Sequence, residues 1–219
     1  MPNRSYTIDN NFPVFIGRAR HAEKLASTDG YWALDAILNS AIALEAFPND
    51  LIRELEISYG FKDTPGCEKL ADSLVNAFRI LPELEPLKVQ IKYQMLYQLL
   101  CGKTFDRGTK PFQDFDFLIT LRNEIVHPKC EGIEHGVDEP YEKVTKKLLN
   151  GIRARKLSNL PDDFHVPWKR HLENGVAASW AVSAARAMII AIVEVVPESS
   201  LKRGLSLTIG PNSSLNRPL

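Results

Sequence analysis

The stretch YWALDAILNSAIALEAF, residues 31–47, decides the fold class of this 219-residue chain. Its apolar residues recur three and four positions apart, which is the spacing of one buried face of an α-helix. They are Leu34, Ile37, Leu38, Ala41, Ile42 and Leu44. Thr28 or Asp29 can cap the start of this helix. Pro48 is expected to kink or break it, because proline removes a helical hydrogen bond, and a second helical stretch follows over residues 50–59.

The same spacing recurs along most of the chain, and no run of alternating β-branched residues predicts a strand. Further helices are expected over residues 68–80, 87–100, 112–126, 141–149 and 174–196. The pattern therefore predicts an all-α fold, a single-domain helical bundle over residues 29–200. Residues 1–28 are expected to form an N-terminal extension and residues 201–219 a mobile tail.

The composition is that of an ordinary soluble globular protein, with 44% hydrophobic residues, 25% charged residues and a formal net charge of zero. A neutral total excludes a protein that coats nucleic acid by bulk charge. The three cysteines share no metal-ligand spacing and fit a reducing, cytoplasmic compartment, so we expect no metal and no cofactor. No signal peptide is expected. Arg186 and Glu194 interrupt the apolar stretch 176–196, which favours a buried helix over a membrane span.

One polar residue interrupts the apolar face of the helix expected over residues 112–126. The apolar residues on that face are Phe115, Leu118, Ile119, Ile125 and Val126. Arg122 falls near the middle of the face, where an arginine is seldom buried without a partner. Two explanations are open: the guanidinium reaches water at an edge of the bundle, or it pairs with Glu45, a carboxylate on the apolar stripe of the first helix.

His127 follows this helix and precedes Pro128. The residue before a proline is disfavoured in the α conformation, so the helix is expected to end here. The imidazole can then turn towards Arg122. A histidine in this position is either a surface or capping residue or a group that exchanges protons near neutral pH.

The segment LRNEIVH, residues 121–127, resembles the signature of HEPN domains. These all-α proteins carry an arginine, a polar residue directly after it, and a histidine beyond four to six intervening residues. This chain has the four-residue spacing and asparagine as the polar residue. The segment AIALEAF, residues 41–47, resembles the early Glu-bearing helix of many HEPN proteins. The resemblance in helix order covers roughly residues 30–200.

The resemblance implies a metal-independent endoribonuclease. In such an enzyme the 2′-hydroxyl of the RNA attacks the adjacent phosphate, leaving a 2′,3′-cyclic phosphate and a 5′-hydroxyl end. Arg122 would grip phosphate oxygens, and His127 would act as acid or base. Asn123 would donate a hydrogen bond to phosphate or orient His127. Glu45 would hold the Arg122 side chain in place.

The resemblance also implies partners. HEPN domains usually form homodimers with a composite active site, and such ribonucleases resemble parts of toxin–antitoxin and phage-defence systems. We therefore expect an RNA substrate, a second copy of the chain, an antitoxin or regulatory protein as a possible partner, and no membrane. Local basic residues that could hold RNA are Lys143, Lys146, Lys147, Arg153, Lys169 and Arg170. A solvated helix face is the alternative explanation for such a charge run.

Three other functions stay open. The chain can be a HEPN-like module without catalysis that binds nucleic acid, a nucleotide or a protein. Glu124 and His127 have the E-x-x-H spacing of di-iron bundles, although the sequence holds no second such pair. Cys101 could serve a cysteine hydrolase, but a small buried thiol is the simpler interpretation. The remaining histidines, His21, His135, His165 and His171, are expected to be solvated, and Trp32 and Trp180 are expected in the core.

Overall fold

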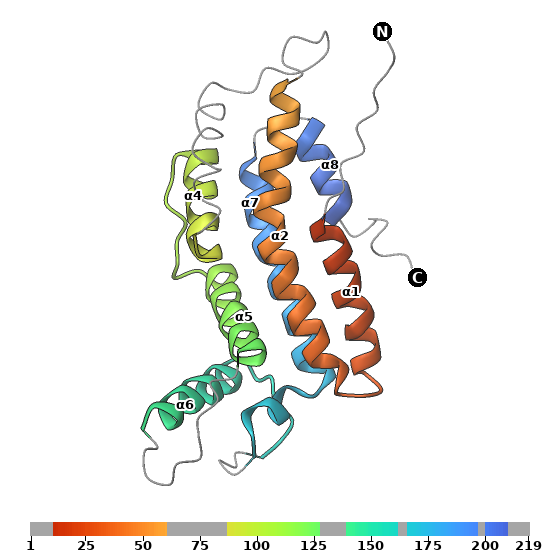
Figure 1. Cartoon of the computed structure of the whole chain (residues 1–219), viewed down its shortest axis with the longest axis vertical. Coiled ribbons are helices and arrows are strands. Elements are labelled where there is room, and N and C mark those ends of the chain that lie inside the picture. Colours follow the sequence, from red (N-terminus) through yellow and green to blue (C-terminus); the bar gives the residue numbers. More distant parts are fainter. Residues whose placement is uncertain (1–10, 61–86, 128–138, 162–165, 197–199, 210–219) are drawn as a thin grey trace. The chain divides into compact units, whose positions relative to one another are not determined.

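A computed structural model describes residues 11–60, 87–127, 139–161, 166–196 and 200–209 of the chain. Over these ranges it contains seven α-helices, one 3-10 helix and no β-strand, which confirms the predicted all-α fold (Figure 1). The elements are α1 (Asn11–Ala26), α2 (Trp32–Gly60), α4 (Val89–Cys101), α5 (Lys110–Val126), α6 (Glu139–Ala154), η2 (Trp168–Leu172), α7 (Gly175–Val195) and α8 (Ser200–Ile209). The helix predicted over residues 68–80 lies outside the described ranges.

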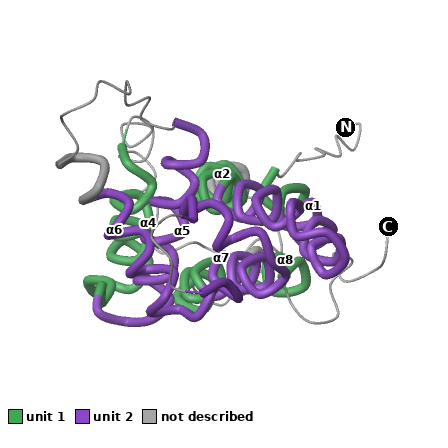
Figure 2. The backbone as a smooth tube through the Cα atoms, turned by 90° about the horizontal axis from the view of Figure 1, so that it is seen from below, with its two compact units in different colours: residues 1–15, 42–107, 188–219 green, residues 16–41, 108–187 purple. Residues whose placement is uncertain are grey.

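The chain divides into two compact units that are interleaved in sequence (Figure 2). Unit 1 consists of Met1–Phe15, Ile42–Arg107 and Met188–Leu219. Unit 2 consists of Ile16–Ala41 and Gly108–Ala187. Helices α1, α2 and α7 each contribute residues to both units.

Residues 11–26, part of the expected N-terminal extension over residues 1–28, form helix α1. The side chain of Asp50 caps the helix: its Oδ2 accepts hydrogen bonds from the backbone N–H groups of Asn11 and Phe12, at 2.7 Å each. These donors have no partner inside a helix, so a carboxylate there stabilises the helix end. Burial raises the pKa of Asp50, and the two backbone N–H groups lower it in part.

The aromatic rings of Phe12, Phe47 and Tyr93 pack together in unit 1. Phe12 meets Phe47 edge-on with ring centroids 5.1 Å apart, and Phe47 stacks on Tyr93 at 6.1 Å. All three side chains are buried. Phe12 thereby joins α1 to a core to which α2 and α4 also contribute.

Of the kink or break predicted at Pro48, the break is wrong, because helix α2 continues through this residue. Proline has no N–H group, which deprives the carbonyl oxygen of Leu44, four residues earlier, of its usual helical donor. The hydroxyl of Tyr93 donates a hydrogen bond to that oxygen at 3.1 Å. Since Tyr93 and Leu44 are both fully buried, this bond satisfies a carbonyl that water does not reach.

Replacing Tyr93 by phenylalanine is expected to lower the free energy of unfolding by about 1–2 kcal/mol, because the Leu44 carbonyl loses a donor while the ring stays in place. In a Pro48→Ala background the cost should be smaller, since the restored backbone N–H can bond to the same oxygen. Urea unfolding of the four proteins measures both costs. An equal cost in the two backgrounds would show that Tyr93 does not replace the missing amide.

Residues 200–209 form α8, so the expected mobile tail over residues 201–219 is wrong for the part that the structure describes. Leu205 and Ile209, one helical turn apart, are both buried. The ammonium of Lys202 donates to the carbonyl oxygen of Glu194 at 3.1 Å. Ten residues that include two serines and a glycine are too short a pattern to predict a helix, and the burial of Leu205 and Ile209 decides the outcome. Residues 210–219 lie outside the described ranges.

Small side chains allow close helix packing in unit 2. A buried cluster joins α1, α2 and α7 through Ala22, Ala26, Ala33, Ala36 and Ala178. Gly30 lies so close to the backbone of Glu173 that a β-carbon on it would overlap the Glu173 carbonyl oxygen. Among the described helices α7 alone is long and apolar enough to cross a membrane, and more than half of its most apolar window is buried in the fold.

Candidate functional site

The C-terminal end of α5 carries the residues of the predicted site. Pro111 lies in the first turn of the helix, where its missing N–H costs nothing. His127 is the C-terminal cap, with φ −118° and ψ 64°, and its N–H donates to the carbonyl oxygen of Asn123 at 2.9 Å. The helix therefore ends at Val126, as predicted from the proline that follows His127.

The structure brings the side chains of Arg122 and Asn123 together. Nη1 of Arg122 donates to Oδ1 of Asn123 at 2.9 Å. A guanidinium offers only donors, so its partner must be the amide oxygen, and the Asn123 amide presents its Nδ2 donors elsewhere. Arg122 is half-buried, whereas Asn123 and His127 are exposed. An arginine and an amide that both offer N–H groups next to water form an arrangement suited to an anion such as phosphate.

The buried face of α5 differs from the predicted one towards its C-terminal end. The buried residues are Phe112, Asp114, Phe115, Leu118, Ile119 and Leu121. Ile125 is only half-buried, and Val126 is 46% exposed. Arg122 therefore lies at the border of the buried face and not near its middle. A wheel pattern assumes that a core accompanies the whole helix, whereas the last turn of α5 projects into solvent.

Glu45 and Arg122 fall in different units, Glu45 in unit 1 and Arg122 in unit 2. Glu45 is half-buried beside the fully buried Leu44 on α2. The predicted pairing of its carboxylate with the Arg122 guanidinium stays a prediction.

The basic residues of α6 lie mainly on its solvated side. Lys146 and Lys147 are exposed, while the opposite side of the helix buries Leu148, Leu149 and Ile152. Arg153 is half-buried, and its Nη1 lies 3.4 Å from Oδ1 of Asn150. The side chain of Lys143 lies outside the described part of the chain. Lys146 and Lys147 are thus accessible to a phosphate, and a solvated helix face explains them equally well.

Lys169 and Arg170 lie on η2 beside aromatic rings. The Lys169 ammonium is 5.7 Å from the ring centroid of Trp168. Arg170 is exposed, and its Nη1 donates to the hydroxyl of Tyr31 at 3.2 Å and to Oε2 of Glu173 at 3.1 Å. The Arg170 guanidinium carbon also lies 5.8 Å from the Tyr31 ring centroid.

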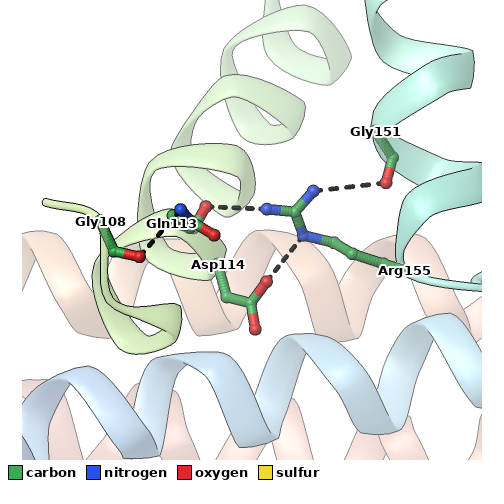
Figure 3. A network of polar contacts seen from close by, with 5 residues as sticks. All are labelled: Gly108, Gln113, Asp114, Gly151 and Arg155. Atoms are coloured by element: carbon green, nitrogen blue, oxygen red, sulfur yellow. Dashed lines mark hydrogen bonds and ion pairs between the residues drawn. The ribbon is translucent and has the colours of Figure 1, made fainter.

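Arg155, directly after α6, binds the first turn of α5 (Figure 3). Its Nε donates to Oδ1 of Asp114 at 2.7 Å, its Nη2 to the carbonyl oxygen of Gln113 at 3.0 Å, and its Nη1 to that of Gly151 at 3.3 Å. The guanidinium carbon lies 4.3 Å from the ring centroid of Phe117. Arg155 is therefore a structural residue of unit 2. Sequence reasoning missed this role because Arg155 and Asp114 are 41 positions apart.

Gly151 allows α6 to lie against the ring of Phe117, and a β-carbon at this position would overlap that ring. The ring cannot easily move, because it packs on Arg155 and, edge-on, on Trp180 with centroids 5.7 Å apart. Glycine destabilises a helix relative to alanine, but at position 151 only glycine leaves room for the Phe117 ring.

Replacing Gly151 by alanine is expected to lower the free energy of unfolding by about 1–3 kcal/mol through overpacking. Gly204 in α8 is the matched control, since a β-carbon added there would meet no other atom within 4 Å. Gly204→Ala should be neutral or stabilising by up to about 1 kcal/mol, as helix propensity dictates. Thermal unfolding compares the two variants. A stabilised Gly151→Ala protein would contradict the close packing.

Two further predictions about aromatic and imidazole side chains are wrong. His171 is not solvated: it is only 3% exposed, with its Nδ1 2.8 Å from Oγ of Ser158. This contact joins η2 to the loop after α6, where Ser158 Oγ also accepts a hydrogen bond from the N–H of Leu160 at 3.0 Å. Trp32 is not a core residue, since it is 40% exposed. Trp180 is half-buried against Phe117, and His21 is solvated as predicted.

The rival chemistries find little support in the described ranges. No group of three or more His, Cys, Asp or Glu side chains there could hold a metal ion. Cys101 is half-buried at the end of α4, and its thiol donates to the carbonyl oxygen of Tyr97 at 3.1 Å. His135 and His165 fall outside those ranges.

Comparison of the chain with protein-family models, with curated proteins and with solved structures gives no match.

Proposed function

We propose that this chain is a metal-independent endoribonuclease that uses Arg122, Asn123 and His127. The observation that carries the proposal is the hydrogen bond from Arg122 to Asn123, which sets two N–H-bearing side chains at the end of α5 beside the exposed His127. None of these three side chains is fully buried. They resemble the HEPN signature in type and spacing, and Asn123 and His127 are exposed, as contact with a macromolecular substrate requires.

The reaction needs two proton transfers and charge stabilisation. A base takes the proton of the RNA 2′-hydroxyl, and the resulting oxygen attacks the neighbouring phosphorus. The bond from phosphorus to the 5′-oxygen breaks, and an acid protonates the leaving oxygen. His127 supplies one of these proton transfers, and His127 of a second copy supplies the other in a homodimer. Arg122 and Asn123 donate hydrogen bonds to the phosphate oxygens, where negative charge develops.

The biological setting proposed for this activity is a toxin–antitoxin or phage-defence system, with an antitoxin or regulatory protein that restrains it. A ribonuclease without such a restraint should slow the growth of cells that overexpress it. Overexpression of the wild type and of His127→Ala, with growth followed in both, tests this point: equal growth would contradict an unrestrained toxin.

The competing function is a HEPN-like module that binds without cleaving. Incubating RNA with the wild type and with His127→Ala in the presence of EDTA separates the two functions. Cleavage by the wild type alone supports the ribonuclease. Intact RNA in both samples would overturn the proposed function and leave the binding module.

A further inference from the structure

Two adjacent aromatic residues at the start of α2 remain in contact with water. Tyr31 is 61% exposed and Trp32 is 40% exposed. Burying a large aromatic side chain stabilises a fold, so two exposed neighbours that the core does not use are the kind of surface that binds a partner. Elsewhere in unit 2 the buried rings of Phe112 and Phe115 show that this core does take up aromatic side chains.

Several close contacts hold the backbone next to this aromatic pair. Gly30 touches the backbone of Glu173. The side chain of Asn174 joins three nearby segments. Its Nδ2 donates to the carbonyl oxygens of Leu157 and His171, at 2.9 Å each, and its Oδ1 accepts from the N–H of Ala177 at 3.0 Å. The α1–α2 turn, η2 and the start of α7 are thereby held together. Side chains on such a base are preorganised and lose little freedom on binding.

Arg170 contacts the hydroxyl of Tyr31, and Lys169 precedes Arg170 on η2. Arg170 is oriented by Tyr31 and Glu173, and Lys169 extends over the ring of Trp168. We infer that the surface formed by Tyr31, Trp32, Lys169 and Arg170 binds an unpaired stretch of RNA. The bases stack on the two exposed rings, and the two cations contact the phosphates. Aromatic rings combined with basic side chains are how proteins hold single strands without reading their sequence.

The choice of RNA as the ligand rests on the proposed function. Unpaired RNA is favoured because its bases can stack on exposed aromatic side chains, whereas the bases of a duplex are already stacked on one another. The pairing of Arg170 with Glu173 keeps the local charge small. Stacking therefore contributes more of the affinity than charge does, and the dependence on salt should be shallow.

The test measures binding apart from cleavage. Fluorescence anisotropy of a labelled oligouridine of about 12 nucleotides is followed with the full chain in a His127→Ala background, so that the probe stays intact. Tyr31→Ala should weaken binding about 5- to 100-fold and leave the salt dependence unchanged. Tyr31→Phe keeps the ring but loses the hydroxyl that Arg170 contacts, and it should bind like the parent protein. Binding of a duplex of the same length should not respond to Tyr31→Ala.

Removing a cation of this surface should change the salt dependence of RNA binding. Arg170→Ala should reduce the slope of log Kd against log salt concentration by about 0.7, the value for one phosphate contact on a single strand. Lys103→Ala, which removes an exposed cation of unit 1, is the matched control and should leave the slope unchanged.

Unchanged affinity of Tyr31→Ala for the single strand would overturn the inference. A change in oligomeric state of that variant with unchanged RNA affinity would also overturn it, and would assign the surface to a protein interface. Failure of the proposed function is seen separately, as equal RNA integrity with the wild type and His127→Ala. The binding assay does not depend on that result.

Discussion

Replacing Arg122 by alanine is expected to reduce kcat for RNA cleavage about 100- to 1,000-fold, the usual loss when one donor to a developing oxyanion is removed. The physical reason is the position of the guanidinium, which is half-buried and oriented by its hydrogen bond to Asn123. Because the side chain lies at the border of the core, its loss should change protein stability little. Initial rates on a fluorogenic RNA at saturating concentration, with thermal unfolding of the same samples, check both expectations.

Two companion variants separate charge from geometry. Arg122→Lys keeps the positive charge but loses the planar pair of donors, so its rate should lie between those of the wild type and Arg122→Ala. Asn123→Ala keeps the arginine and removes the amide that orients it, and we expect a loss of about tenfold. A full wild-type rate in Arg122→Ala would remove Arg122 from the proposed mechanism.

Replacing Arg155 by alanine is expected to have the largest effect on stability, lowering the free energy of unfolding by about 3 kcal/mol. The variant leaves the Asp114 carboxylate, whose side chain is only 13% exposed, without its ion-pair partner. It also removes donors to the carbonyl oxygens of Gln113 and Gly151 and the group that covers the ring of Phe117. Urea unfolding measures the change.

A double-mutant cycle with Asp114→Asn isolates the ion pair. In that background the carboxylate is neutralised, so Arg155→Ala should cost about 1–2 kcal/mol less than it does alone. Arg155→Lys should recover the charge but not the forked hydrogen bonds. Its free energy of unfolding should therefore lie between those of the wild type and Arg155→Ala. Equal costs of Arg155→Ala with and without the carboxylate would show that the pair contributes nothing to stability.

The fold class could be predicted from the sequence because helical periodicity is a local signal. Residues 32–47 do lie in α2, and of the predicted apolar face Ile37, Ala41 and Leu44 are buried, whereas Leu34, Leu38 and Ile42 are half-buried. The errors arise where a distant group decides a local outcome. The Asp50 carboxylate that caps α1 is 39 positions from Asn11, and the Tyr93 hydroxyl that bonds beside Pro48 is 49 positions from Leu44.

In the candidate site, too, the features set by neighbouring residues could be predicted and those set by distant segments could not. Arg122, Asn123 and His127 are neighbours in sequence, so their position at one helix end could be predicted, and the structure places them there. The partner of Asp114 and the exposure of Trp32 could not be predicted, because both depend on which segments pack nearby. Propensity and periodicity describe a helix but not what covers it.

The most direct test of the proposed ribonuclease is the chemistry of the RNA ends that it leaves. RNA incubated with the purified wild type in EDTA should acquire 2′,3′-cyclic phosphate and 5′-hydroxyl ends, and RNA incubated with His127→Ala should not. Fragments with 5′-phosphate and 3′-hydroxyl ends, or RNA of unchanged length with the wild type, would contradict cleavage through the 2′-hydroxyl by Arg122, Asn123 and His127.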